Sequence, residues 1–165
     1  MDIIPAIDLR DGRCVRLIQG RYDRQITYHD DPVAQARQFR MEGARWLHVV
    51  DLDGAKAGRP VNTATIAALA AWGGLRIEVG GGLRHEQSIQ ALLDLGVERV
   101  ILGTQAVKDP AWFARMAAQF KGRIVLGLDA RGDTVATHGW LQDSKLKVLD
   151  FAVKAAALPL AAIIY

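Results

Sequence analysis

Cysteine is nearly absent from this 165-residue sequence, which contains only Cys14. One cysteine excludes an internal disulfide and a zinc site built from several thiolates. Long apolar runs are missing as well. The longest candidate covers residues 155–165 and is interrupted by Pro159, so it falls short of the roughly 20 residues that span a bilayer. We therefore expect no membrane partner.

An excess of charge of one sign is also missing, because 21 Lys+Arg face 18 Asp+Glu and the net charge is +3. Such a small excess of positive charge does not indicate a nucleic-acid partner. Charged residues surround the short apolar run at the amino terminus, so no signal peptide is predicted and we expect a cytoplasmic location. A content of 50% hydrophobic and 24% charged residues is typical of a globular domain and not of a disordered chain.

Short apolar runs recur along the chain and are separated by helical patterns. The runs are mostly continuous, which favours parallel strands buried on both faces. The predicted strands cover residues 3–7, 46–50, 75–79, 100–102, 124–128 and 160–165. The predicted helices run from 32 to about 43, from 65 to 72, from 85 to 95, from 110 to about 122 and from 149 to 158. This alternation predicts βαβ units around a parallel sheet.

The connections and one internal repeat refine this prediction. Two connections are long, residues 9–28 and 130–147, and the first should contain a hairpin at Asp11-Gly12. A shift of 121 residues superposes residues 4–10 on 125–131, and each copy is a buried strand with an aspartate followed by a long loop. We interpret this as a duplicated half-domain.

The spacing of the strands gives the fold class. The strands start about 31 residues apart, so eight units would need roughly 250 residues, the usual size of a (β/α)₈ TIM barrel. We therefore predict an incomplete parallel α/β barrel with about six of the eight units. It should form a single domain over residues 1–165, with a first half-barrel at about 1–122 and the start of a second at 123–165.

Two aspartates are the main catalytic candidates. Asp8 and Asp129 each lie at the carboxyl end of a predicted strand, where barrel active sites form. The first and fifth strands of a closed barrel are opposite each other, so one carboxyl could donate a proton while the other accepts one. The spacing alone is equally consistent with aspartates that only cap the loops.

Glycines after the third and fourth predicted strands suggest a phosphate site. Gly81 and Gly82 follow one strand, and Gly103 and Thr104 follow the next. Backbone N–H groups near helix amino termini favour an anion, although plain turn glycines would give the same pattern. The spacing matches neither a dinucleotide-binding nor a Walker fingerprint.

Four other residues are weaker candidates when taken alone. His48 lies within a predicted strand, where a histidine is more often a hydrogen-bonded core residue than a functional one. Arg16 and Arg84 would ordinarily be solvated, and Trp140 on the second long loop would either pack on the barrel or stack on a planar ligand. The four histidines show no pairwise metal spacing, so no metal site is predicted.

The motifs together resemble one enzyme family over the whole chain. They read IIPAIDLRDGRCVRLIQG, LHVVDLDGAKAG, EVGGGLR, VILGTQAVKD, LGLDARGDTVATHGW and a terminal IIY. In this order and spacing they resemble the phosphoribosylformimino-5-aminoimidazole carboxamide ribotide isomerases of histidine biosynthesis. The resemblance implies a (β/α)₈ barrel made of two similar halves, and an Amadori rearrangement of an aminoaldose to an aminoketose that needs no cofactor and no metal.

The resemblance also implies roles for the candidate residues. Asp8 and Asp129 would be the catalytic pair, and we expect Asp8 to act as base and Asp129 as acid. The glycine turns with Thr104 would hold one phosphate of a bisphosphorylated ribonucleotide. Trp140 would stack on the imidazole, while Arg16, His48 and Arg84 would contact the substrate near the reacting sugar.

The family continues beyond the terminal IIY into two further strands that carry a second phosphate site. A chain without them has open sheet edges and lacks one positioning contact. We therefore expect the 165-residue chain alone to be nearly inactive and able to self-associate, although full-length members would be monomeric.

Three alternatives compete with this assignment. The related cyclase has a cysteine and a lysine in regions where this sequence has Ala6 and Arg16, which disfavours it. A bifunctional isomerase that also acts on phosphoribosylanthranilate has an arginine-rich run before the loop tryptophan. This sequence has Thr137-His138 there, which counts mildly against that alternative. A non-catalytic barrel fragment remains the third alternative.

Overall fold

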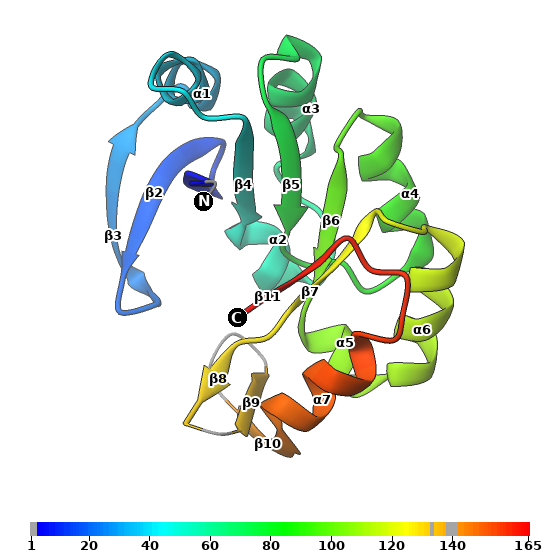
Figure 1. Cartoon of the computed structure of the whole chain (residues 1–165). Coiled ribbons are helices and arrows are strands. Elements are labelled where there is room, and N and C mark those ends of the chain that lie inside the picture. The colour runs from blue at the N-terminus through cyan, green and yellow to red at the C-terminus, as the bar shows by residue number, and fades with distance from the viewer. Residues whose placement is uncertain (1–2, 133, 138–141) are drawn as a thin grey trace. The chain divides into compact units, whose positions relative to one another are not determined.

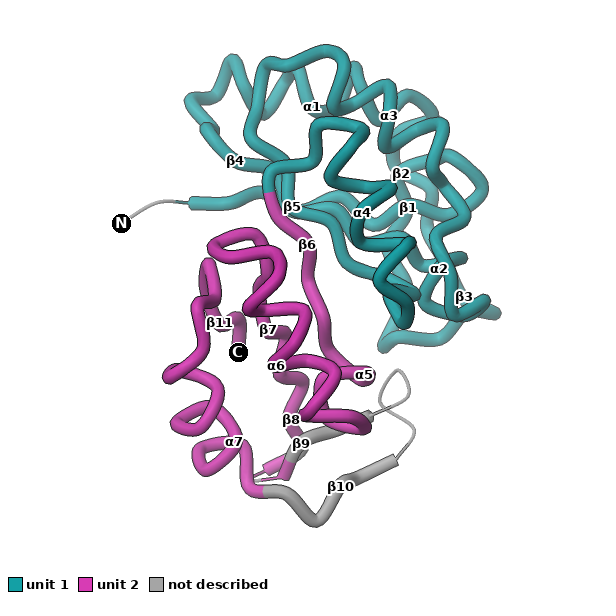
Figure 2. The backbone as a smooth tube through the Cα atoms, turned by 90° about the vertical axis from the view of Figure 1, so that its right-hand side faces the viewer, with its two compact units in different colours: residues 1–98 teal, residues 99–165 magenta. Residues whose placement is uncertain are grey.

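The computed structural model describes residues 3–132, 134–137 and 142–165, which alternate between strands and helices (Figure 1). The chain forms two compact units, residues 1–98 and 99–165 (Figure 2). Each unit is an α/β arrangement with its own parallel strands. No helix among the described residues has both the length and the apolar character to cross a membrane.

The first unit combines three parallel strands with an antiparallel hairpin. The strand order is β5-β4-β1-β2-β3, in which β1, β4 and β5 are parallel while β2 and β3 are antiparallel. In chain order its elements are β1 (Ala6–Arg10), β2 (Arg13–Ile18), β3 (Arg21–His29), α1 (Pro32–Met41), β4 (Trp46–Asp51), α2 (Leu52–Ala57), α3 (Thr63–Trp72), β5 (Arg76–Gly80) and α4 (Glu86–Asp94).

The second unit has three parallel strands, in the order β11-β7-β6, and a small antiparallel sheet, β10-β9-β8. In chain order its elements are β6 (Arg99–Leu102), α5 (Thr104–Lys108), α6 (Pro110–Gln119), β7 (Ile124–Gly127), β8 (Ala130–Arg131), β9 (Thr134–Thr137), β10 (Gln142–Lys147), α7 (Val148–Ala155) and β11 (Ala162–Ile164).

The predicted fold class is confirmed. All six predicted strands are present, they are parallel within each unit, and helices alternate with them as in a (β/α) barrel. Two short helices, α2 and α5, were not predicted, because they have only six and five residues and begin within two residues of the preceding strand. Whether a half-barrel boundary lies near residue 122 stays a prediction.

The first strand lies further along the chain than predicted. It was expected at residues 3–7, but β1 covers Ala6–Arg10. The reason is that its second half pairs with β2, where Asp8 lies opposite Val15 and Arg10 opposite Arg13. The predicted turn at Asp11-Gly12 closes this hairpin, with positive φ values of 49° and 73°. Asp8 therefore lies in the middle of a strand and not at its end.

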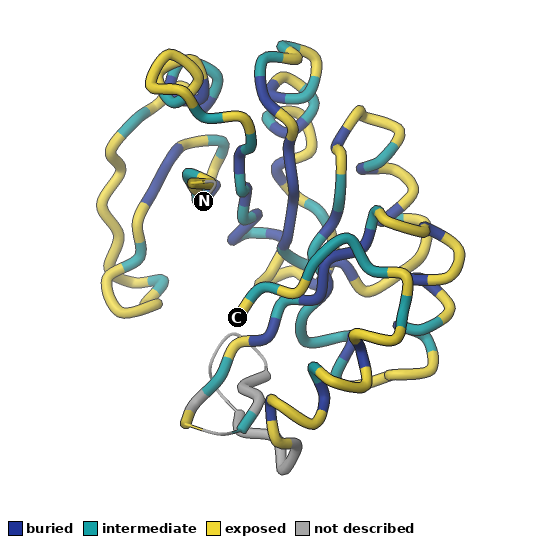
Figure 3. Tube along the Cα trace, viewed as in Figure 1, coloured by how far each residue is buried: buried dark blue, intermediate teal, exposed yellow. Residues whose placement is uncertain are grey.

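The prediction of strands buried on both faces is only partly correct. Along β4 the residues alternate between buried and half-buried, as Figure 3 shows. The fully covered face carries the core, with Ile7, Leu9, Leu47, Val49, Ile77 and Val79 at most 2% exposed. The other face of β1 and β4 is more open, and it carries Asp8 and His48.

The helix boundaries follow local capping chemistry. Asp31 begins α1, where its carboxylate accepts hydrogen bonds from the amides of Val33 at 2.9 Å and Ala34 at 3.1 Å. Asp109 begins α6 in the same way, through the amide of Trp112 at 2.9 Å. In both cases a proline follows the capping residue, as the sequence predicts.

Replacing the Asp31 cap of α1 should destabilise the first unit. Asp31→Ala leaves the first amides of α1 without their acceptor, and we expect a loss of about 1 kcal/mol in the free energy of unfolding, measured by urea denaturation. Asp30→Ala is the matched control, because Asp30 only forms an exposed ion pair with Arg13 at 3.6 Å, and such pairs contribute little. Equal losses in the two variants would contradict the capping role.

Candidate active site

Asp8 lies at a hollow of about 320 Å³ in the first unit. The hollow is lined by β1 and by the β2–β3 hairpin, through Ala6, Asp8, Val15, Arg16, Leu17 and Tyr28. Burial raises the pKa of the Asp8 carboxyl above its ordinary value, while the charges of His48 and Arg16 act in the opposite direction. A half-buried carboxyl beside two basic side chains can exchange a proton with a bound ligand.

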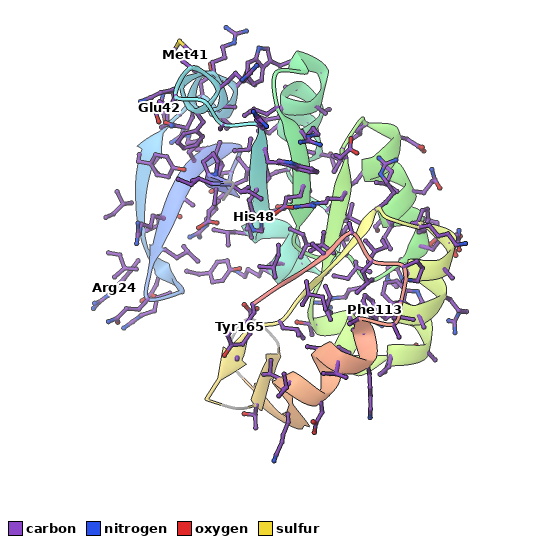
Figure 4. The ribbon with its side chains drawn as sticks, viewed as in Figure 1. Arg24, Met41, Glu42, His48, Phe113 and Tyr165 are labelled. Carbon is purple, nitrogen blue, oxygen red and sulfur yellow. The ribbon has the colours of Figure 1, made fainter. Side chains whose placement is uncertain are left out.

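The register of the sheet places His48 and Glu78 near this carboxyl. Ala6, His48 and Glu78 are aligned across β1, β4 and β5, and Asp8, Val50 and Gly80 form the next row. His48 Nδ1 lies 2.6 Å from Glu78 Oε1. The Glu78 side chain is only 1% exposed, whereas that of His48 is 24% exposed. Figure 4 labels His48 on β4.

Cys14 and Tyr28 form a second contact beside the hollow. Burial raises the pKa of the Cys14 thiol to about 11 and that of the Tyr28 hydroxyl to about 12, and a hydrogen bond joins the two side chains. Both groups are therefore neutral at ordinary pH. Cys14 is fully buried and, without a thiolate, is a poor nucleophile.

The glycines after β5 are required by close packing. Gly81 and Gly82 have φ values of 114° and 74°. A Cβ atom on Gly81 would overlap the carbonyl oxygen of Asp51, and one on Gly82 would overlap that of Gly54. This turn therefore lies directly on the loop that follows β4. Its backbone is open enough to approach a ligand, but packing alone already accounts for both glycines.

Asp51 organises the loop beneath these glycines. Its side chain is 1% exposed and accepts hydrogen bonds from four donors. These are the amides of Gly54 at 2.8 Å, Val61 at 2.7 Å and Asn62 at 3.0 Å, and the Asn62 Nδ2 atom at 2.7 Å. A buried carboxylate with four donors is well satisfied and fixes the residues between β4 and α3.

The same network reaches the β1–β2 hairpin. Asn62 Oδ1 accepts a hydrogen bond from the Gly12 amide at 2.9 Å, and Asp53 Oδ2 accepts one from the Asp11 amide at 2.8 Å. Asn62 Nδ2 also donates to Asp53 at 2.9 Å. The hairpin that carries Arg16 is thus attached to the loops after β4 through its backbone.

Arg84 lies elsewhere in the first unit. Its guanidinium group covers Gly58, where a Cβ atom would meet Nη1 at 2.5 Å and Cζ at 2.6 Å. Gly58 ends α2 with a φ of 74°. Arg84 is therefore a neighbour of the α2 loop and is not among the residues that line the Asp8 hollow.

The second unit carries the other predicted residues. Asp129 follows β7 directly after Leu128, and although the residue is exposed, crowding of its carboxyl by protein atoms raises the pKa. Gly103 precedes α5, and Thr104 is the first residue of that helix. A Cβ atom on Gly103 would lie 3.3 Å from the Gly127 carbonyl oxygen, so β6 and β7 approach closely there. Trp140 lies outside the described residues.

The sequence prediction missed two residues that shape the site, Glu78 and Tyr28, and it gave Asp51 no role. A glutamate in the apolar run at residues 75–79 was a visible signal for Glu78, because a buried acid needs a partner. For Tyr28 no sequence signal was available, since the contact depends on the β2–β3 register. Asp51 could have been found from the Asp51-Leu52-Asp53-Gly54 run, which is typical of a strand followed by a cap.

Other ligand chemistry has less support. Within the described residues, no group of three or more His, Cys, Asp or Glu side chains could hold a metal ion. A second hollow of about 360 Å³ is lined by Arg40, Arg45, Arg76 and the stretch 73–75. None of the predicted site residues lines it.

Taken together, parallel strands that alternate with helices and carry carboxyl groups and glycine turns near their carboxyl ends define an α/β protein of the barrel class. The chain belongs to the family described as "Histidine biosynthesis protein", whose profile matches residues 2–165.

Curated relatives match the whole chain. A protein of Synechocystis is 52% identical over 165 residues, one of Gloeothece citriformis is 51% identical and one of Herpetosiphon aurantiacus is 50% identical. Each is named 1-(5-phosphoribosyl)-5-((5-phosphoribosylamino)methylideneamino) imidazole-4-carboxamide isomerase. The alignments cover 100% of this chain and 64%, 64% and 69% of these relatives, respectively. The chain thus spans about two thirds of their length.

The Asp51 network should dominate the stability of the first unit. Asp51→Asn removes the buried charge and turns an amide N–H₂ toward N–H donors, so we expect the free energy of unfolding to fall by about 3 kcal/mol. Chemical denaturation measures the change. Asp94→Asn is the control, because Asp94 accepts only an exposed contact from Gln90 at 2.7 Å. A loss in Asp51→Asn no larger than in the control would contradict this role.

The Asp8 carboxyl should lower the stability of the folded protein at neutral pH. Burial raises its pKa in the folded state, so its ionised form is penalised at neutral pH. We expect Asp8→Asn to unfold with a larger free energy than the wild type at pH 7. The difference should shrink as the pH falls toward 3.8, the ordinary aspartate value, and vanish below it, where the carboxyl is protonated in both the folded and the unfolded state.

Urea denaturation across this pH range measures the effect. Asp23→Asn provides a comparison of opposite sign, because the hydrogen bond from Arg21 lowers the pKa of this exposed carboxyl. It should give a small loss at neutral pH, or none. A destabilised Asp8→Asn, or a gain that does not depend on pH, would contradict the explanation.

Proposed function

We propose that this chain carries acid–base machinery of an aldose–ketose isomerase that acts on a bisphosphorylated ribonucleotide in histidine biosynthesis. The observation that carries the proposal is the pair of carboxyls, Asp8 and Asp129, each with a raised pKa, in a chain 50–52% identical over its whole length to proteins named as this isomerase. The substrate is the one in the relatives' name, which contains two phosphoribosyl groups.

In the proposed reaction, one carboxyl protonates the furanose oxygen and opens the ring to a Schiff base. The other carboxylate then removes the C2 proton, and the resulting enolamine becomes the ketone. We assign Asp8 as the base: burial raises its pKa, but the charges of His48 and Arg16 oppose this shift and favour the ionised form, whereas no such charge acts on Asp129 among the causes of its shift. Asp129 is assigned as the acid, because burial is the cause of its shift and favours the protonated form.

The proposal gives the remaining candidates binding roles. The amides of the turn at Gly81 and Gly82 and those around Gly103 and Thr104 would bind one phosphate, since open backbone N–H groups favour an anion. Arg16, at the Asp8 hollow, would offset the negative charge of the substrate. His48 would contact the sugar beside Asp8, Arg84 would contact the substrate from the α2 side, and Trp140 would stack on the imidazole.

Three further expectations belong to this proposal. The reaction requires neither a cofactor nor a metal, because proton transfers account for every step. The protein is expected in the cytoplasm, with neither a nucleic-acid nor a membrane partner and with a monomeric full-length form. The two half-barrels would meet near residue 122, so that Asp8 and Asp129 occupy equivalent positions of a duplicated unit.

Turnover tests the proposal. The purified protein that contains this chain is assayed with the ribotide, and formation of the ketose product is followed. We expect Asp8→Asn and Asp129→Asn each to lower kcat by about 10²–10⁴-fold, because each removes one proton-transfer group. Asp94→Asn, an exposed aspartate on α4, should retain the wild-type rate.

Two results would contradict the proposal. A folded protein that binds the ribotide but gives no ketose would overturn the activity. Wild-type rates in either aspartate variant would overturn the role of that residue while leaving the activity itself in place.

A further inference from the structure

Glu78 has a role that the proposed reaction does not use. It is a glutamate in the buried strand β5, and its side chain is only 1% exposed. Its Oε1 atom lies 2.6 Å from Nδ1 of His48 on the adjacent strand β4. A carboxylate is costly to bury and is retained where it holds a partner in a defined state.

The contact between His48 and Glu78 fixes the orientation of the imidazole ring, with Nδ1 toward Glu78 and Nε2 on the other side. A carboxylate can only accept a hydrogen bond, so an ionised Glu78 pairs with the His48 tautomer that carries its proton on Nδ1. The other nitrogen, Nε2, lies on the opposite edge of the imidazole and therefore points away from Glu78. The His48 side chain is 24% exposed, so part of the ring can reach a ligand.

The parallel register connects this pair to Asp8. Glu78, His48 and Ala6 form one row across β5, β4 and β1, and Asp8 lies two residues after Ala6 on the same face. Ala6 is small and leaves space beside the imidazole, and Gly80 adds no side chain to the next row. His48 is close enough to Asp8 for its charge to lower the pKa of that carboxyl.

From this geometry we infer that Glu78 is a positioning residue that keeps the proton on Nδ1 of His48 and orients Nε2 toward the Asp8 hollow. The inference rests on the proposed function, because it gives Glu78 an indirect role in the base step. Glu78 itself does not touch the substrate. It acts through His48, and His48 acts on Asp8.

Other charged groups also act on this carboxyl and must be considered. Arg16 on β2 lowers the pKa of Asp8. Tyr28 and Tyr22 on β3 interact electrostatically with Asp8, and both phenols have pKa values raised by burial, so they are neutral at the pH of an assay. His48 and Arg16 are thus the cations that favour the Asp8 carboxylate, and Glu78 controls only the first of them.

The protonation state of His48 can be measured without activity. Nitrogen-15 NMR of labelled histidines distinguishes a protonated from an unprotonated Nδ1, and His48→Gln identifies the His48 signals among the four histidines. We expect a protonated Nδ1 in the wild type. We expect the same in the control variant Glu42→Gln, which changes an exposed glutamate whose carboxylate accepts a hydrogen bond from Gln38. In Glu78→Leu the proton should move mainly to Nε2, which free neutral imidazole favours. An unprotonated Nδ1 in the wild type, or no change in Glu78→Leu, would overturn the inference.

The pH profile of turnover tests the effect on Asp8. Glu78→Gln preserves the shape of the side chain but removes its charge, so Nδ1 of His48 loses its charged acceptor. The ring is then held less firmly beside Asp8, and its charge lowers the pKa of that carboxyl less. We expect the acidic limb of kcat/KM to move upward by about one pH unit, or tenfold in proton concentration, with the rate recovering at higher pH. Glu42→Gln should leave the limb in place.

A purely structural role for Glu78 would give a different result. In that case Glu78→Gln would lower the rate equally at every pH without moving the limb, and the inference would be overturned. The absence of any turnover in the wild type would overturn the proposed function instead, and the NMR measurement would still decide whether Glu78 positions His48.

Discussion

The buried carboxylate of Asp51 is the interaction on which the geometry of the first unit depends. Four donors between residues 54 and 62 converge on it. Because the loop after β4 is fixed in this way, the turn after β5 can pack on it so closely that Gly81 and Gly82 have no room for a side chain. The ends of β1, β4 and β5 are therefore set by one network rather than by independent turns.

This network also explains how a half-open site can remain ordered. The face of β1 and β4 that carries Asp8 and His48 is less covered than the face that carries Ile7, Leu47 and Val49. Apolar burial cannot position side chains there as firmly as in the core. Hydrogen bonds with defined partners do so instead, through Asp51 and Asn62 at the strand ends and through Glu78 within the sheet.

The sequence was sufficient for the strands, the longer helices and the α/β class, because apolar runs and caps such as Asp31-Pro32 are local signals. It was also sufficient to single out Asp8, His48 and Arg16, which do belong to one neighbourhood of the first unit. It was not sufficient for Glu78 or Tyr28. Their roles depend on which residue lies opposite on the next strand, and register is not a local property. The position of the first strand was missed for the same reason, whereas α2 was missed because the helix is so short.

The attachment of the β1–β2 hairpin has an evolutionary consequence. The hairpin is tied to the loops after β4 through the main-chain amides of Asp11 and Gly12, which every residue other than proline can supply. Natural variation can therefore exchange side chains on the hairpin, such as that of Arg16 at the Asp8 hollow, without loosening its anchor. In this fold, the side chains of the hairpin can diverge while selection on the anchor acts mainly on Asp53 and Asn62.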